Sequence, residues 1–215
     1  MGTVERRDRE KAERRRTILA AARNIFTTEG FATATMPAIA EDAQLAPGTI
    51  YLYFPSKDSL YAELLVEGYQ GLEERLRAAI AVEAPPRRCA DAFIDAYLAF
   101  SREHPEYLDI VSFVAQREAP GGVPVLDTDQ VRRIREREDA CKVLADKMLG
   151  RSDYGTMRDV RGAVDAIWCM LTGLALFLRH ADQATFFNAA RQAKAIILDS
   201  VFPGRDRSHR SKQGP

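Results

Sequence analysis

The side chains of residues 47–54 have a spacing that suits contact with a polar macromolecule. Ile50 and Phe54 lie four residues apart, so on a helix they share one face, which we expect to be buried. Four of the other positions carry hydroxyl groups or no side chain and face outward; they are Gly48, Thr49, Tyr51 and Tyr53. Hydroxyl groups donate and accept hydrogen bonds, and small residues let the backbone approach a ligand closely. This segment is therefore the first candidate for a binding surface.

Two short helices and a turn must position these side chains. Ile39 and Ala40 are apolar residues of a first short helix, which residues 44–46 interrupt. Pro47 then opens a second helix, because its fixed φ suits the first helical position. Pro55 ends this helix, since the residue before a proline avoids the α region. Two helices of about seven residues joined by a short turn form a helix-turn-helix, whose second helix can enter a DNA major groove.

The segment from Thr35 to Leu60 resembles the DNA-binding domain of the tetracycline-repressor (TetR) family. The matching motifs are IA at 39–40, GTIYLYF at 48–54 and SK at 56–57. Upstream, IFTTEGFATAT at 25–35 resembles the end of the family's first helix and the turn after it. Close resemblance covers roughly residues 12–65, and beyond residue 65 it rests on helix layout and length. It implies a homodimeric regulator that binds double-stranded DNA.

The resemblance also implies roles for individual residues. Tyr51 matches a tyrosine that contacts DNA, and Tyr53 stands where a phosphate-bonded histidine is frequent. Lys57 matches a phosphate-contacting lysine, and Thr35 matches a threonine that caps the second helix and contacts phosphate. We therefore expect DNA to be contacted by Thr35, Pro47, Gly48, Thr49, Tyr51, Tyr53 and Lys57. The alternatives are a packing role for Tyr51 and an ordinary solvated side chain for Lys57.

Four positions depart from the family pattern. Pro37 replaces a residue that is often polar or basic, and Ala46 replaces a frequent capping serine. Gln44 stands where a turn glycine is common, and Leu52 offers no hydrogen bond. Base-specific recognition is therefore poor in donors, and we expect it to use thymine methyl groups and DNA shape.

The charge of the chain is balanced overall but uneven along the sequence. Lys and Arg together number 31, as do Asp and Glu, so the formal net charge is zero. The N-terminal segment nevertheless holds Arg14, Arg15 and Arg16 in a row, with more basic residues before them and acidic residues interleaved. Two interpretations stay open: an ion-paired, solvated helix start, or an arm that approaches phosphate.

Composition and motifs favour a cytoplasmic protein that is not an enzyme. A hydrophobic content of 46% allows a buried core, and the most apolar window, residues 166–178, is too short to span a bilayer. The charged N-terminus is unlike a secretory signal. Cys89, Cys141 and Cys169 are too far apart for a disulfide framework or paired zinc ligands. With no catalytic motif, we expect no enzyme activity, no metal, no cofactor and no membrane contact.

Helical periodicity without strand-like alternation predicts an all-α fold of about nine helices. We expect a helix-turn-helix DNA-binding domain at 8–56, a helical ligand-binding and dimerisation domain at 57–203, and a disordered tail at 204–215. A long helix at about 57–82 would link the two domains. Gly68 and Gly71 weaken its middle by up to roughly 1 kcal/mol each relative to alanine.

A ligand site in the second domain is implied by the resemblance and not by residue spacing. The candidate residues are aromatic side chains and a few polar ones; they are Tyr69, Phe93, Tyr97, Phe100, Phe113, Arg117, Trp168 and Thr172. Such a site would take a small apolar or aromatic molecule. The alternative for each aromatic side chain is plain core packing.

The apolar character of the last two helices predicts the dimer interface. Residues 166–178 are apolar nearly all round, which a single helix of a soluble monomer does not need. The interface residues that we expect are Leu174, Phe177, Ile196, Ile197 and Val201. The alternative is burial of these side chains within one chain.

Together these expectations favour a ligand-responsive, DNA-binding regulator, namely a repressor released from a palindromic operator by a small apolar molecule. Two alternatives remain. One is a helix-turn-helix protein that is controlled by protein partners or organises DNA, without a small-molecule inducer. The other is an all-α enzyme, which a cluster of titratable groups in a cleft would support.

Overall fold

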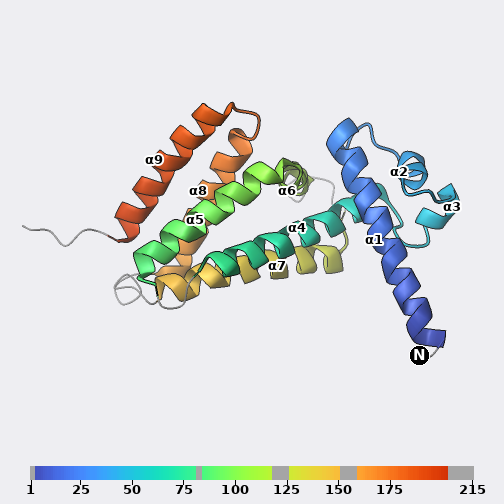
Figure 1. The fold of residues 1–215 in the computed structure, drawn as a ribbon, viewed down its shortest axis with the longest axis horizontal. Helices are drawn as coiled ribbons and strands as arrows, with labels where there is room; N and C mark the ends of the chain where they lie inside the picture. Colours follow the sequence, from blue (N-terminus) through green and yellow to red (C-terminus); the bar gives the residue numbers. More distant parts are fainter. Residues whose placement is uncertain (1–2, 81–83, 118–125, 151–158, 203–215) are drawn as a thin grey trace, which may run out of the picture. The chain divides into compact units, whose positions relative to one another are not determined.

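The chain folds as α-helices throughout the part that the structure describes. The computed structural model describes residues 3–80, 84–117, 126–150 and 159–202, and these contain nine helices and no strand (Figure 1). The helices are α1 (Thr3–Glu29), α2 (Met36–Asp42), α3 (Pro47–Ile50), α4 (Lys57–Ala79), α5 (Pro86–Glu103), α6 (Pro105–Arg117), α7 (Thr128–Leu149), α8 (Val160–Phe177) and α9 (Gln183–Val201). The all-α prediction is confirmed.

The helices form two compact units. The first unit comprises Met1–Gly71 and His104–Glu138, and the second comprises Leu72–Glu103 and Asp139–Pro215. The division falls within α4 and within α7, so each of these helices contributes to both units. The domain boundary that we predicted at residue 57 coincides with the start of α4, whereas the two compact units meet within this helix. The predicted boundary stays a prediction. The predicted disordered tail at 204–215 lies outside the described residues.

The core of the first unit follows the apolar spacing of the sequence. Ile18, Ala22 and Phe26, spaced at i, i+4 and i+8, form the buried stripe of α1. Ile50 and Phe54 are also buried, at 0% and 2% exposure, which confirms the predicted inward face of the second short helix. α1 packs on α2, and α2 packs on α3. The outward positions of this segment are thereby fixed.

Capping side chains set the starts of α2 and α4. The Thr35 hydroxyl accepts a hydrogen bond from the Ala38 N–H at 3.3 Å, as expected of a capping threonine. The Ser59 N–H donates to the Ser56 hydroxyl oxygen at 3.1 Å, and the Ser56 N–H donates to the Ser59 hydroxyl oxygen at 3.2 Å. This reciprocal pair satisfies two N–H groups at the end of a helix.

The second short helix is shorter than predicted. α3 ends at Ile50, with Tyr51 as its C-cap, and the chain continues to Phe54 in tight turns. The Tyr53 N–H donates to the Ile50 carbonyl at 3.0 Å, a three-residue spacing that tightens the end of a helix before Pro55.

The turn between α2 and α3 holds a residue in the left-handed region. Gln44 has a φ of 56°, the conformation that glycine adopts without steric cost. This φ gives a physical reason for the turn glycine that the family resemblance implies at this position. A nonglycine residue there costs about 1 kcal/mol.

Gly68 has a packing role in α4. A Cβ built at Gly68 would overlap the ring of Tyr107 on α6. The glycine therefore lets an aromatic ring lie directly against the helix backbone, which offsets the loss of helix propensity predicted for this position.

The second unit is a helical bundle. α5, α8 and α9 pack on one another (Figure 1). Their buried side chains include Phe93, Trp168 and Phe186. Aspartates cap two of these helices: the Gly162 N–H donates to Asp159 at 3.1 Å, and the Thr185 N–H donates to Asp182 at 2.9 Å.

The apolar helix α8 is longer than the apolar window predicted at 166–178. Over Val160–Phe177 its mean hydropathy is 1.5, so by length and composition alone this helix could cross a membrane, contrary to the expectation from the shorter window. The helix also forms ion pairs with α7: Arg161 with Asp139 at 2.7 Å, and Asp165 with Lys142 at 3.1 Å. Core helices of soluble proteins reach the same composition, so α8 is weak evidence for a membrane span.

Lys57 serves the fold in a way that its predicted phosphate contact does not anticipate. Its ammonium donates to the carbonyl oxygens of Phe31 at 2.6 Å and Ala34 at 2.9 Å, and more weakly to Ala32 at 3.5 Å. It also lies 4.3 Å from the centre of the Phe31 ring. An ammonium has three donors, and all three are directed at this loop. The structure therefore gives Lys57 the role of holding the α1–α2 connection.

We expect Lys57→Met to lower the free energy of unfolding by about 2 kcal/mol, because it leaves part-buried carbonyl groups without a donor. Lys11→Met is the matched control, since Lys11 is exposed on α1 and should change stability by less than about 0.5 kcal/mol. Urea denaturation of both variants measures the difference. Equal stability of the two variants would contradict the structural role of Lys57.

Candidate nucleic-acid interface

The outward side of the helix-turn-helix is open to a partner. Tyr51 is 51% exposed and Leu52 80% exposed, and no atom lies within 4 Å of a Cβ built at Gly48. Pro47 is exposed as well, whereas Thr49 is half-buried. Tyr51 and Leu52 are thus adjacent exposed side chains that another molecule can contact.

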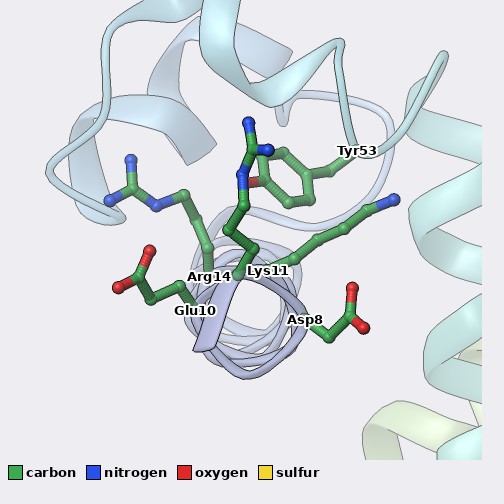
Figure 2. A pocket seen from close by; sticks show the side chains of 6 residues that line it. Asp8, Glu10, Lys11, Arg14 and Tyr53 are labelled. Atoms are coloured by element: carbon green, nitrogen blue, oxygen red, sulfur yellow. The ribbon is translucent and has the colours of Figure 1, made fainter. Parts of the chain in front are cut away.

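Thr35 lies at the start of α2 with its side chain exposed, while its hydroxyl oxygen caps the helix. The position is compatible with the expected phosphate contact, because the start of a helix presents N–H groups that attract anions. Tyr53 is half-buried and faces α1 (Figure 2).

The long helix α1 sorts the interleaved charges of the N-terminal segment. Arg7, Lys11 and Arg14 are spaced at i, i+4 and i+7, so they lie along one face of the helix. Ile18 continues the same spacing and is fully buried in the first unit. The basic stripe is therefore the N-terminal extension of the face with which α1 packs on the helix-turn-helix.

A cavity of about 510 Å³ lies between this basic stripe and Tyr53. Its lining residues are Arg7, Asp8, Glu10, Lys11, Arg14 and Tyr53. Figure 2, which looks along α1, shows Lys11 and Arg14 on the side of the helix that faces Tyr53. Asp8 and Glu10 project to the two flanks. A phosphate in the cavity would meet the cations and the tyrosine hydroxyl first.

The basic stripe is not neutralised within the described residues. Glu10 forms an ion pair with Arg6 at 3.5 Å, on a different part of the helix surface. Arg7, Lys11 and Arg14 form no ion pair with any carboxylate that the structure describes. Sequence reasoning left the role of this segment open, and the helical spacing 7–11–14 was the signal that could have decided it.

A half-buried carboxylate on α4 holds α1, and through α1 the end of the α3 segment, which we define as residues 47–54. Glu63 on α4 forms ion pairs with Arg15 of α1 and Arg133 of α7, each at 2.8 Å. The Arg15 guanidinium also lies 4.4 Å from the centre of the Phe54 ring, which follows α3. Burial alone would raise the pKa of Glu63, but the hydrogen bonds and charges of Arg133 and Arg15 outweigh burial and hold it below its usual value.

The neighbouring Glu67 has the opposite shift. Burial raises its pKa, and the negative charge of Glu63 adds to this, although Arg23 lies at 2.7 Å and opposes both. The group with the lowered pKa, Glu63, contributes stability above its unfolded pKa and loses it as pH falls. The raised pKa of Glu67 means that this group binds a proton more readily in the folded state. Its contribution to stability therefore grows as pH falls.

The predicted ligand residues fall into both units. In the second unit Tyr97 and Trp168 are in edge-to-face contact, with ring centres 5.2 Å apart, and the Tyr97 hydroxyl lies 2.8 Å from that of Thr172. Phe93 and Phe100 are buried in the same unit. The structure thus brings Tyr97, Trp168 and Thr172 together.

The other predicted ligand residues lie elsewhere. Tyr69 and Phe113 belong to the first unit. The Phe113 ring packs against Phe31 and Tyr61, with ring centres 4.3 Å and 5.1 Å apart, so there it serves core packing. The side chain of Arg117 lies outside the described residues.

The predicted dimer residues divide by exposure. Phe177 is 86% exposed and Ile196 64% exposed, and Leu174 is half-buried. Ile197 and Val201 are buried within the single chain, at 2% and 5% exposure, so for them the alternative of intrachain packing holds. Sequence reasoning missed Met170, which is 46% exposed. Ala166, Met170 and Phe177 are spaced along one side of α8.

Comparison with known proteins finds the same family in the N-terminal region. Residues 18–64 match the model of the bacterial regulatory proteins of the tetR family. The transcriptional regulator UidR of Escherichia coli K12 is 38% identical over 63 residues, which are 29% of this chain and 32% of UidR. The chain thus spans about a third of the length of this relative.

Solved structures share the fold over most of the chain. The fatty acid degradation regulator FadR from Bacillus halodurans superposes with a TM-score of 0.68 at 20% identity, over 90% of this chain and 97% of FadR. FadR from Bacillus subtilis, solved in complex with stearoyl-CoA, has a TM-score of 0.67 at 20% identity, over 85% of this chain and 96% of that one. Residues 18–64 thus carry the N-terminal domain of the tetR family of bacterial regulatory proteins, and the solved structures show that the fold is shared over most of the chain.

Proposed function

We propose that the protein is a DNA-binding transcriptional regulator, a homodimeric repressor that a small apolar ligand releases from a palindromic operator. Two neighbouring surfaces carry the proposal. One is the exposed part of residues 47–54, and the other is the unpaired basic stripe of α1, which shares a cavity with Tyr53. A partner that fits both must offer a groove with polar base edges and methyl groups beside rows of phosphates, as duplex DNA does.

The two surfaces have different tasks in this proposal. Gly48, Thr49 and Tyr51, together with the exposed Leu52, face base edges and thymine methyl groups in the major groove. Arg7, Lys11 and Arg14 hold the adjacent phosphates with Tyr53, which fixes the position of α3 on the duplex. Lys57 has no part in the proposed contact, because its donors are used within the fold.

The proposed ligand site is the contact of Tyr97, Trp168 and Thr172 in the second unit. Its paired hydroxyl groups can orient a ligand, and its aromatic rings suit an apolar body. A fold neighbour was solved in complex with stearoyl-CoA, which supports a small-molecule ligand for this protein. A ligand that binds better to a state unable to hold DNA would shift the population toward that state.

A second candidate function is regulation by a protein partner in place of a small molecule. It is favoured by the burial of Phe93, Tyr97 and Trp168, which are at most 6% exposed and thus packed as a core. The two candidates differ in whether ligand and DNA affect each other's binding.

The proposed dimer interface uses the exposed apolar side of α8 and Ile196 of α9. Exposed side chains as large as Phe177 and Ile196 are costly in a soluble monomer, and a two-fold mate would cover them. We assign this surface to a protein partner and not to lipid, because α8 also forms ion pairs with α7. We likewise propose a cytoplasmic location, as the proposed binding of DNA requires.

The DNA proposal predicts that Lys11→Met and Arg14→Gln weaken binding to all DNA sequences about equally. Each removes one phosphate contact per head, so the log–log slope of affinity against salt should fall by roughly one per head. Arg6→Gln is the control, because Arg6 is already paired with Glu10. Fluorescence anisotropy with a duplex selected from a random pool measures the slope. An unchanged slope in both variants would refute the phosphate role of the basic stripe.

The interface proposal predicts that Phe177→Glu converts the dimer into a folded monomer. A carboxylate at this position would be buried without a partner in the interface, whereas it is solvated in the monomer. Leu52→Glu is the control, since Leu52 is just as exposed but lies in the DNA-facing segment. Sedimentation equilibrium at about 10 μM tests this, a concentration at which a specific dimer is populated. A wild-type monomer, or an unaffected variant, would contradict the proposal.

The ligand proposal predicts reciprocal coupling between DNA and ligand. Stearoyl-CoA serves as the probe, and the fluorescence of Trp168, the single tryptophan, reports its binding. Saturation with the selected duplex should lower the affinity of the probe by a factor of about 5–150, as linkage requires. Equal affinity with and without DNA, or no binding, would favour control by a protein partner.

A further inference from the structure

A groove in the second unit lies between α5 and α9 and is separate from the proposed ligand site. It has a volume of about 600 Å³, which is in the range of small-molecule sites. One wall is formed by Asp95, Leu98, Ala99 and Arg102 of α5, at i, i+3, i+4 and i+7. The other wall is formed by Phe187, Ala190, Arg191 and Lys194 of α9, with the same spacing. Two matching helix faces therefore enclose the groove.

The floor of the groove is apolar. Leu98, Phe186 and Ala190 are at most 7% exposed and lie beneath it. Phe187 stands at its edge with 55% exposure, in edge-to-face contact with Phe186 at 5.9 Å between ring centres. A flat apolar group in the groove would contact both rings and would cover the exposed one.

The rim of the groove carries positive charge that the fold leaves unpaired. Arg102 lies over the Phe186 ring at 4.8 Å and donates to the Ala181 carbonyl at 3.3 Å. Arg191 donates to the side-chain oxygen of Asn188 at 3.1 Å. Within the described part of the chain neither guanidinium has a carboxylate partner, so each can still bind an anion.

The other charges of the groove are already neutralised. Lys194 forms ion pairs with Asp91 at 3.1 Å and with Asp95 at 2.8 Å. Glu103 forms a bidentate pair with Arg75. The charge left available to a ligand is therefore that of the two arginines.

This groove stays free when the proposed dimer forms. Phe187 and Ile196 are nine residues apart on α9, which at 3.6 residues per turn places them on opposite faces, about 180° apart. The groove and the proposed interface thus use different sides of the same helix. Tyr97 of the proposed ligand site likewise lies on another face of α5 than Leu98 and Arg102.

From these observations we propose that the α5–α9 groove is a second binding site, for a small organic carboxylate with a flat apolar body. The apolar body lies on Leu98 and Phe186 against the ring of Phe187. The carboxylate is held by Arg102 and Arg191. Binding here involves neither DNA nor the buried contact of Tyr97 with Trp168, so it can be tested independently of the proposed function.

The test uses 2-naphthoate as the probe and ¹⁹F NMR as the readout. 4-Fluorophenylalanine is placed at Phe187, at the edge of the groove, and in a second sample at Phe177, which is exposed but outside it. We expect a saturable shift at position 187 and none at position 177. The neutral analogue 2-naphthamide should bind at least about tenfold more weakly, because it lacks the charge for the two arginines.

Substitutions then assign the charge. Arg102→Gln and Arg191→Gln should each weaken naphthoate binding by about tenfold, whereas the control Arg88→Gln, an exposed arginine of α5 outside the groove, should not. Ala99→Trp should abolish binding by filling the groove, with helicity checked by circular dichroism. Equal affinity for acid and amide, insensitivity to both glutamine variants, or an equal shift at position 177 would overturn the proposal.

Discussion

The first unit depends on one half-buried carboxylate, that of Glu63 on α4. It lies between Arg15 of α1 and Arg133 of α7, and Arg15 in turn lies over the ring of Phe54 at the end of the α3 segment. Leaving a part-buried charge without partners is costly, so the three helices that supply these charges must stay together. The position of residues 47–54 relative to α1 therefore depends on the ion pair of Arg15 and its contact with the Phe54 ring, in addition to apolar packing. The lowered pKa of Glu63 shows the same balance: its two arginines outweigh the penalty of burial.

The ion pairs of Glu63 and Glu67 also determine which basic residues of α1 remain available to a partner. Arg15 and Arg23 turn toward Glu63 and Glu67 and are used within the fold. The stripe of Arg7, Lys11 and Arg14 continues past the last packed turn, where no described carboxylate meets it. A chain with zero net charge can thus present a basic surface, because helical periodicity separates charges that alternate in the sequence. Net charge is a poor guide to nucleic-acid binding when charges are sorted by the fold.

Local rules explain which features the sequence could predict. The inward positions of Ile50 and Phe54, the caps by Thr35 and Ser56, and the helical nature of each segment follow from spacing and backbone chemistry within a few residues. The role of Lys57 could not be predicted, because its acceptors lie 23 to 26 residues away in the α1–α2 connection. The groupings of Phe113 with Phe31, and of Tyr97 with Trp168 and Thr172, depend on tertiary contacts in the same way. Helical periodicity predicts which side chains share one face of a helix, but it does not predict which other helix packs against that face.

The same reasoning separates the surfaces of the second unit. α9 buries Ile197 and Val201 within the chain, exposes Ile196 on one side, and directs Phe187 and Arg191 to the α5 groove on the other. A helix has room for three such faces because successive residues are about 100° apart. The apolar residues of α9 therefore do not all belong to one interface between two copies of the chain. In this protein the sequence pattern of α9 combines core packing, the surface that we propose for a second copy of the chain, and one wall of a charged groove. These three faces of α9 can be told apart only when the helices that pack against each of them are known.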